Sequence, residues 1–196
     1  MTPEDVLTYW LGPLDDDYPR ANMALWFQKS EATDAEIRER FGDAVEAAGR
    51  GELAAWRETP RGALAEIILL DQFTRNIHRT GGEAWALDDE ALDRCLMALE
   101  RGFDEGLHLY ERLFMYLPLE HAENRALQRK SVRLFERLRD EAPDELKKTA
   151  ENLLDYAEKH AVIVERFGRF PHRNERLGRA STDEELAFLE TPGSSF

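Results

Sequence analysis

Apolar residues recur along this chain three and four positions apart, the spacing typical of one face of a helix. Capping residues and glycine or proline stops bound the segments expected to be helical: 2–10, 20–28, 33–48, 59–80, 88–101, 110–124, 127–139, 143–167 and one from 181. No segment shows the two-residue alternation of a half-buried strand. The pattern therefore predicts an all-α protein.

The predicted helices follow one another with short connections, which favours antiparallel neighbours. The 196 residues are 42% apolar, enough for one hydrophobic core, and no proline-rich or low-complexity linker divides them. We expect a single compact domain over residues 1–196, ending in a coil tail at 191–196.

The charge of the chain argues against nucleic acid as a partner. The formal net charge is −14, which a phosphate backbone would repel. Between Arg166 and Arg179, however, five arginines and His172 stand against the single acid Glu175. Such a local basic segment suits a small anion, and its alternative role is to form surface salt bridges and helix caps.

Other features of the sequence indicate the cellular compartment of the protein. No run of about 18 apolar residues predicts a membrane span, and the acidic N-terminus lacks the basic-then-apolar order of a signal peptide. Cys95 is the only cysteine, so no intrachain disulfide is possible. We expect a cytoplasmic protein that contacts no membrane.

A polar run, residues 71–79, directly follows the apolar helical run 63–70. A helix that is apolar nearly all round is normally buried, so its polar end needs internal partners or a ligand. Four-residue spacing predicts that Asp71 pairs with Arg75 and Gln72 with Asn76. The alternative to a site is a buried network that locks adjacent helices together.

Two further polar segments are candidates. In 116–124, Pro118 is expected to interrupt the helix, so that Glu120 and His121 fall in the first turn of a new one. A glutamate beside a neutral histidine suits proton transfer, or simply caps a helix. In 166–174, arginines alternate with Phe167 and Phe170, and planar guanidinium groups bind carboxylate or phosphate in a bidentate way.

No cofactor or metal is expected. The chain has no phosphate-binding glycine loop, and its one Glu-x-x-His motif (105–108) lacks the second copy that a di-iron bundle needs. A metal held by Glu120, His121, His160 and His172 is arithmetically possible. None of these residues form the His-x-x-x-His pair that places two ligands on one helix face.

The three polar segments, with the opening 6–12 and the end 192–196, resemble the bacterial domain-of-unknown-function family 924. The resemblance covers essentially the whole chain. It implies a right-handed array of antiparallel helical hairpins similar to tetratricopeptide-repeat proteins, and it implies no activity. The sequence departs from the family pattern at Thr74, where proline is expected, and at His78, where tyrosine is expected.

The first functional hypothesis is a pocket for a small anionic ligand, a carboxylate or a phosphate. Its proton-transfer candidates are Glu120, His121 and His172, and its ligand-binding candidates are Asp71, Gln72, Arg75, Asn76, Arg169, Arg173 and Asn174. Within it, Asp71 orients Arg75. Whether such a pocket is catalytic stays open, as does the oligomeric state.

The second hypothesis is a helical-repeat module that binds a peptide or protein, with structural polar clusters. In a third interpretation, the polar clusters have no binding role and only hold the helices together.

Overall fold

The computed structural model describes residues 1–195, and within them every regular element is helical. This confirms the all-α prediction. The chain divides into two compact units, Met1–Pro118 and Leu119 onward. No helix among the described residues is long and apolar enough to cross a membrane.

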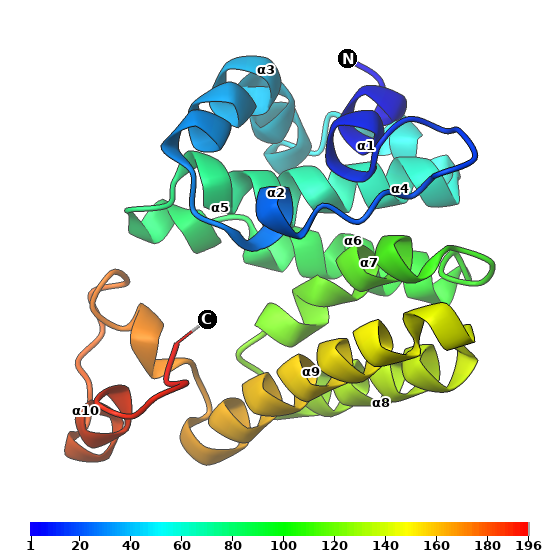
Figure 1. Cartoon of the computed structure of the whole chain (residues 1–196). Coiled ribbons are helices and arrows are strands. Elements are labelled where there is room, and N and C mark those ends of the chain that lie inside the picture. Colours follow the sequence, from blue (N-terminus) through cyan, green and yellow to red (C-terminus); the bar gives the residue numbers. More distant parts are fainter. Residues whose placement is uncertain (196) are drawn as a thin grey trace. The chain divides into compact units, whose positions relative to one another are not determined.

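The first unit is built around one long helix. Thr59 caps its start, with Pro60 in the first turn, as the sequence predicts. It runs through α4 (Pro60–Ile67), a π-helical segment η2 (Ile68–Phe73) and α5 (Thr74–Ile77). In Figure 1 these elements form one continuous rod. Residues 62–74 are all buried, as expected for a helix that is apolar nearly all round.

Other elements pack around this helix: α1 (Pro3–Leu11) and α3 (Glu31–Gly49) on one side, and α6 (Asp88–Glu100) against α4 and η2. Aromatic rings fill the space between α1, α3 and η2, with Phe73 4.8 Å from Phe41 and 5.2 Å from Trp10 between ring centres. The unit also contains α2 (Met23–Phe27), η1 (Ala54–Glu58), η3 (Gly82–Trp85) and most of α7 (Leu109–His121).

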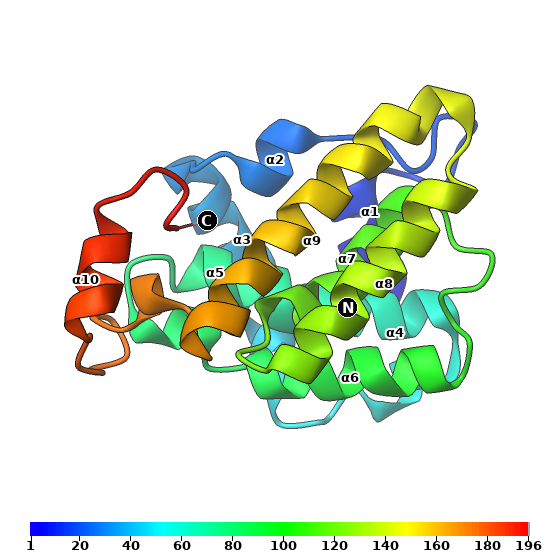
Figure 2. The same ribbon diagram turned by 90° about the horizontal axis from the view of Figure 1, so that it is seen from below.

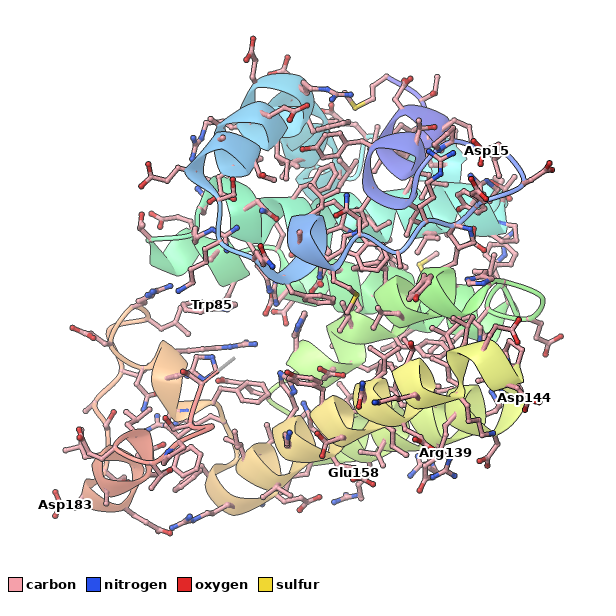
Figure 3. All side chains as sticks on the ribbon, in the orientation of Figure 1. Asp15, Trp85, Arg139, Asp144, Glu158 and Asp183 are labelled. Atoms are coloured by element: carbon pink, nitrogen blue, oxygen red, sulfur yellow. The ribbon has the colours of Figure 1, made fainter. Side chains whose placement is uncertain are left out.

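The second unit is dominated by a helical hairpin of α8 (Arg125–Glu141) and α9 (Lys147–Phe167), joined by the short η4 (Asp144–Leu146). The two helices run side by side in Figures 1 and 2. Figure 3 shows Arg139, Asp144 and Glu158 on the outside of the hairpin. On its inner face, Leu153, Leu154, Ala157 and Val164 are buried, as their spacing predicts.

The hairpin leads into the loop region of the second unit. Helix α9 ends at Gly168, whose φ of 73° lies in the left-handed region that favours glycine. The segment then forms η5 (Pro171–Arg173) and α10 (Asp183–Leu189). Residues 191–195 carry no helix, in line with the expected tail, and Phe196 lies outside the described residues.

Two helix starts differ from the prediction and bear on the polar clusters. Helix α3 begins at Glu31 with Ser30 as its cap, so Asp34 lies inside the helix. Helix α7 continues through Pro118 to His121, which places Glu120 and His121 in the last turn of a helix and not in the first turn of a new one.

Candidate functional site

The polar segment 71–79 lies in the first unit, where Arg75 binds two aspartates. The Arg75 guanidinium donates from Nη1 and Nη2 to the carboxylate of Asp88, at 2.9 and 3.2 Å. It also lies 3.4 Å from Oδ1 of Asp71 and donates to the Asp71 backbone carbonyl at 2.9 Å. The predicted Asp71–Arg75 pair is therefore confirmed, and Asp88 is a partner that sequence reasoning missed.

Two further residues of the segment, Asn76 and Arg79, bind Asp34 of α3. Asn76 Nδ2 donates to Asp34 Oδ1 at 2.8 Å, and Arg79 Nη2 donates to the same oxygen at 2.6 Å. Burial works against ionisation of Asp34, but hydrogen bonds from Arg79 and Asn76 outweigh it and hold the pKa of Asp34 below its usual value.

The predicted Gln72–Asn76 pair is wrong. Gln72 Nε2 donates instead to Asp71 Oδ2 at 2.6 Å. The physical reason is that both amides have acidic acceptors elsewhere: Gln72 donates to Asp71, and Asn76 donates to Asp34. These contacts satisfy the segment within the first unit and favour its structural role. Ligand binding by Asp71, Gln72, Arg75 and Asn76 stays a prediction.

In the second unit, Glu120 and His121 are held by a buried glutamine of α8. Gln128 Nε2 donates to the backbone carbonyls of Glu120 and Ala122, at 2.6 and 2.8 Å. Carbonyls at a helix C-terminus lack intrahelical partners, so this side chain caps the end of α7 and fixes the backbone beneath Glu120.

The Glu120 carboxylate binds a histidine of α9. Glu120 Oε1 lies 3.1 Å from His160 Nδ1, which also lies 2.8 Å from the backbone carbonyl of Tyr156. Both partners are oxygen acceptors, so they assign the imidazole proton to Nδ1 and the lone pair to Nε2. Burial lowers the pKa of His160 to about 3, so the ring is neutral near pH 7.

Sequence reasoning considered His160 only as a metal ligand. A stronger signal was available: His160 falls on the face of α9 that Ala157 and Val164 predict to be buried. A buried imidazole needs hydrogen-bond partners, and Glu120 is one of them.

The fully buried ring of Phe170 is the centre of the group. Its centroid lies 5.6 Å from the His160 ring, 5.7 Å from the His172 ring and 4.6 Å from the Arg173 guanidinium carbon. The His121 ring is 6.2 Å from that of His160. We name these residues the histidine cluster: Glu120, His121, His160, Phe170, His172 and Arg173.

The histidine cluster has a distinct electrostatic character. Arg173 is only 6% exposed, and its permanent charge lies over the face of Phe170. Burial, reinforced by Arg173, lowers the pKa of His172 to about 4, so this imidazole is also neutral near pH 7. The structure thus brings together four predicted site residues, Glu120, His121, His172 and Arg173.

Arg169 and Asn174 lie in a neighbouring network that ties the loop to α10. Arg169 forms a two-pronged pair with Glu185, at 2.6 and 2.7 Å, and Asn174 Nδ2 donates to Ser181 Oγ at 3.0 Å. Arg179 bridges Asn174 to Glu123, which also accepts from the Phe170 N–H at 2.8 Å. These contacts account for Arg169 and Asn174 without a ligand, and their binding role stays a prediction.

Within residues 1–195 no group of three histidine, cysteine or acidic side chains is placed to hold a metal ion. What the histidine cluster offers is a permanent cation, three imidazoles and a carboxylate bound to one of them. Such a set can bind an anion and can accept or donate a proton.

Comparison with known proteins places the chain in a family. A solved structure of a protein of unknown function from Agrobacterium tumefaciens is 41% identical, with a TM-score of 0.75, over 84% of this chain and 88% of that one. No curated protein matches. The family model described as a bacterial protein of unknown function, DUF924, matches residues 6–193. This protein belongs to the DUF924 family.

Proposed function

We propose that the histidine cluster binds a small anionic ligand, a carboxylate or a phosphate, with Arg173 as its principal cation. The observation that carries the proposal is the gathering of Arg173 and three histidines around Phe170 from α7, α9 and η5. Guanidinium N–H groups match the oxygens of these anions, and low exposure strengthens the interaction.

The charges around Arg173 support an anion over a cation. Within this unit, the carboxylate of Glu120 binds His160, and that of Glu123 binds Arg179 and the Phe170 N–H. Arg173 adds a positive charge that does not titrate in the physiological range, and this charge also acts on the Glu123 carboxylate.

The geometry of His160 supports a part in proton transfer. Its Nδ1–H is directed by Glu120 and Tyr156, so Nε2 carries the lone pair that would accept a proton from a ligand. Burial lowers the pKa of His160 to about 3, so the ring would accept a proton only when a bound anion raises that pKa.

The test is a thermal-shift titration of the whole chain with sodium phosphate and, separately, sodium acetate at constant ionic strength. We expect a saturable rise in melting temperature that Arg173→Met removes. Arg129→Met is the matched control, because Arg129 is an exposed arginine paired with Glu165. A rise that survives in Arg173→Met, or no saturable rise in the native chain, overturns the proposal.

We also propose that the α8–α9 hairpin belongs to a tetratricopeptide-like array, and that the chain is one cytoplasmic domain. The antiparallel pairing of α8 and α9 supports the array. A crystal structure tests it through the rotation between successive hairpins. A single cooperative unfolding transition would support one domain, and localisation of a tagged chain would test its compartment.

A further inference from the structure

Helix α8 carries a row of arginines on the face opposite its buried residues. Arg125, Arg129, Arg133 and Arg137 recur at every fourth position, and all four are exposed. Residues four apart are neighbours on one face of a helix, so the arginines form a continuous basic row along α8. This row is unusual in a chain whose formal net charge is −14.

Acids of the second unit neutralise the arginine row only in part. Arg125 and Arg129 both lie against the single carboxylate of Glu165. Arg133 forms no salt bridge with any of residues 1–195. Like charges four residues apart destabilise a helix, so the row weakens α8 in the isolated chain. An acidic partner laid along the row would offset this effect.

A complementary acidic row lies on α6. Asp89 and Asp93 are exposed, and neither forms a salt bridge with any of residues 1–195. Four residues rise about 6 Å along a helix, so these two carboxylates have the same spacing as Arg129 and Arg133. Met97, one turn further along α6 and 40% exposed, adds an apolar contact beside them.

Two other anionic surfaces fit the arginine row less well. The net charge of −14 opposes binding of the row to a nucleic-acid backbone. Basic helices that bind membrane surfaces also bury large apolar side chains in the lipid. The exposed positions of α8 hold only arginine, alanine, aspartate and glutamate. These observations favour a protein surface as the partner.

We propose that α8 of one copy of this chain docks on α6 of a second copy, with Arg129 and Arg133 facing Asp89 and Asp93. The net charge of −14 on each copy opposes the contact. At physiological salt, however, exposed charges farther apart than about 8 Å are largely screened, whereas ion pairs form within about 4 Å. The association is therefore weak, reversible and dependent on ionic strength.

Sedimentation velocity of the whole chain at pH 7 tests the contact. At about 0.15 M salt we expect a mass above that of the monomer, rising with protein concentration. The association should weaken above about 1 M salt, where the ion pairs are screened. A native chain that stays monomeric at every salt concentration overturns the proposal. If a poly-glutamate peptide binds this monomer through Arg133, the partner is another acidic protein and not a second copy.

Charge reversal supplies a sharper test. Arg129→Glu/Arg133→Glu and Asp89→Arg/Asp93→Arg each place like charges across the contact, so each variant alone should associate about tenfold more weakly or less. In a mixture of the two variants, α8 of either one faces opposite charges on α6 of the other. Mixing should therefore restore association, and a mixture as weak as its components overturns the proposal.

A control separates the contact from the effect of net charge. Lys29→Glu/Lys148→Glu replaces two exposed lysines outside the row and changes the net charge by the same amount as Arg129→Glu/Arg133→Glu. It should associate like the native chain, and equal weakening in both variants overturns the proposal. If a double variant does not fold, Arg133→Glu decides, because Arg133 has no salt bridge among residues 1–195 to lose. Unchanged association of Arg133→Glu overturns the proposal.

Discussion

The carboxylate of Glu120 and Nδ1 of His160 lie 3.1 Å apart, although 40 residues separate them in the sequence. Helix α7 supplies the acid in its last turn and α9 supplies the imidazole. The backbone carbonyl of Tyr156 shares the same nitrogen at 2.8 Å. This relationship assigns the proton of the neutral His160 ring to Nδ1.

The first testable prediction concerns the tautomer of His160. Long-range proton–nitrogen NMR spectra at pH 7 should show a neutral ring protonated at Nδ1, because Glu120 and Tyr156 both accept there. In Glu120→Gln the charged acceptor is lost, and the Nδ1 resonance should shift. A native spectrum that shows the proton on Nε2 would contradict the assignment.

The second concerns stability in acid. Burial lowers the pKa of His160 to about 3 and that of His172 to about 4, from 6.5 in the unfolded chain. The unfolded state therefore binds more protons below pH 6.5, and the folded state loses stability as the pH falls toward 4. Each histidine should contribute a slope of up to about 1.4 kcal/mol per pH unit.

Urea unfolding of the native chain and of His160→Asn at pH 4.5 to 7.5 measures this slope. The variant should show a shallower loss of stability in acid. His78→Asn is the control, because His78 is exposed. Identical slopes in the native chain and His160→Asn would refute the assignment.

The third concerns Asp34, which joins α3 to the long helix through Asn76 and Arg79. Asp34→Ala leaves both donors without this acceptor and should lower the free energy of unfolding by about 1–3 kcal/mol. Glu39→Ala removes an exposed acid from the same helix and should cost roughly 0.5 kcal/mol or less. Urea denaturation distinguishes the two, and equal losses would argue against the network.

The fourth concerns Gln128, which caps the end of α7. Gln128→Met keeps the length of the side chain but removes the donor to the carbonyls of Glu120 and Ala122. We expect a loss of about 1–3 kcal/mol, together with altered NMR shifts for His121 and His160. Gln28→Met, at an exposed position, should change neither quantity.

The sequence predicts the helices well because their apolar faces are local patterns. The Thr59–Pro60 start and the buried face of α9 follow from neighbouring residues alone. The partners of the polar residues do not. Asp34 and Asp88 are acids in the first turn of their own helices, and only the packing of α3 and α6 brings them to Arg79 and Arg75.

In the candidate site, too, local sequence predicts some residues, and only the packing of the helices reveals their partners. His172 and Arg173 were predicted from their local composition, because basic residues gather in one loop. His160 was missed as a proton carrier because its partner Glu120 comes from another helix. The path of α7 through Pro118 was also missed, because the side chain that caps its end, Gln128, belongs to the next helix.

The π-helical segment Ile68–Phe73 has a consequence for how this protein can vary in length. A π-helical turn contains one residue more than the α-helical turn it replaces. Because the wider turn absorbs this additional residue, deleting one residue there would restore a plain α-helix whose later residues keep nearly the same facing. Arg75, Asn76 and Arg79 would then still face Asp88 and Asp34. A deletion elsewhere in the long helix would instead rotate these residues by about 100°. The π-helical segment is therefore the place where this helix can lose one residue with the least disturbance to those pairs.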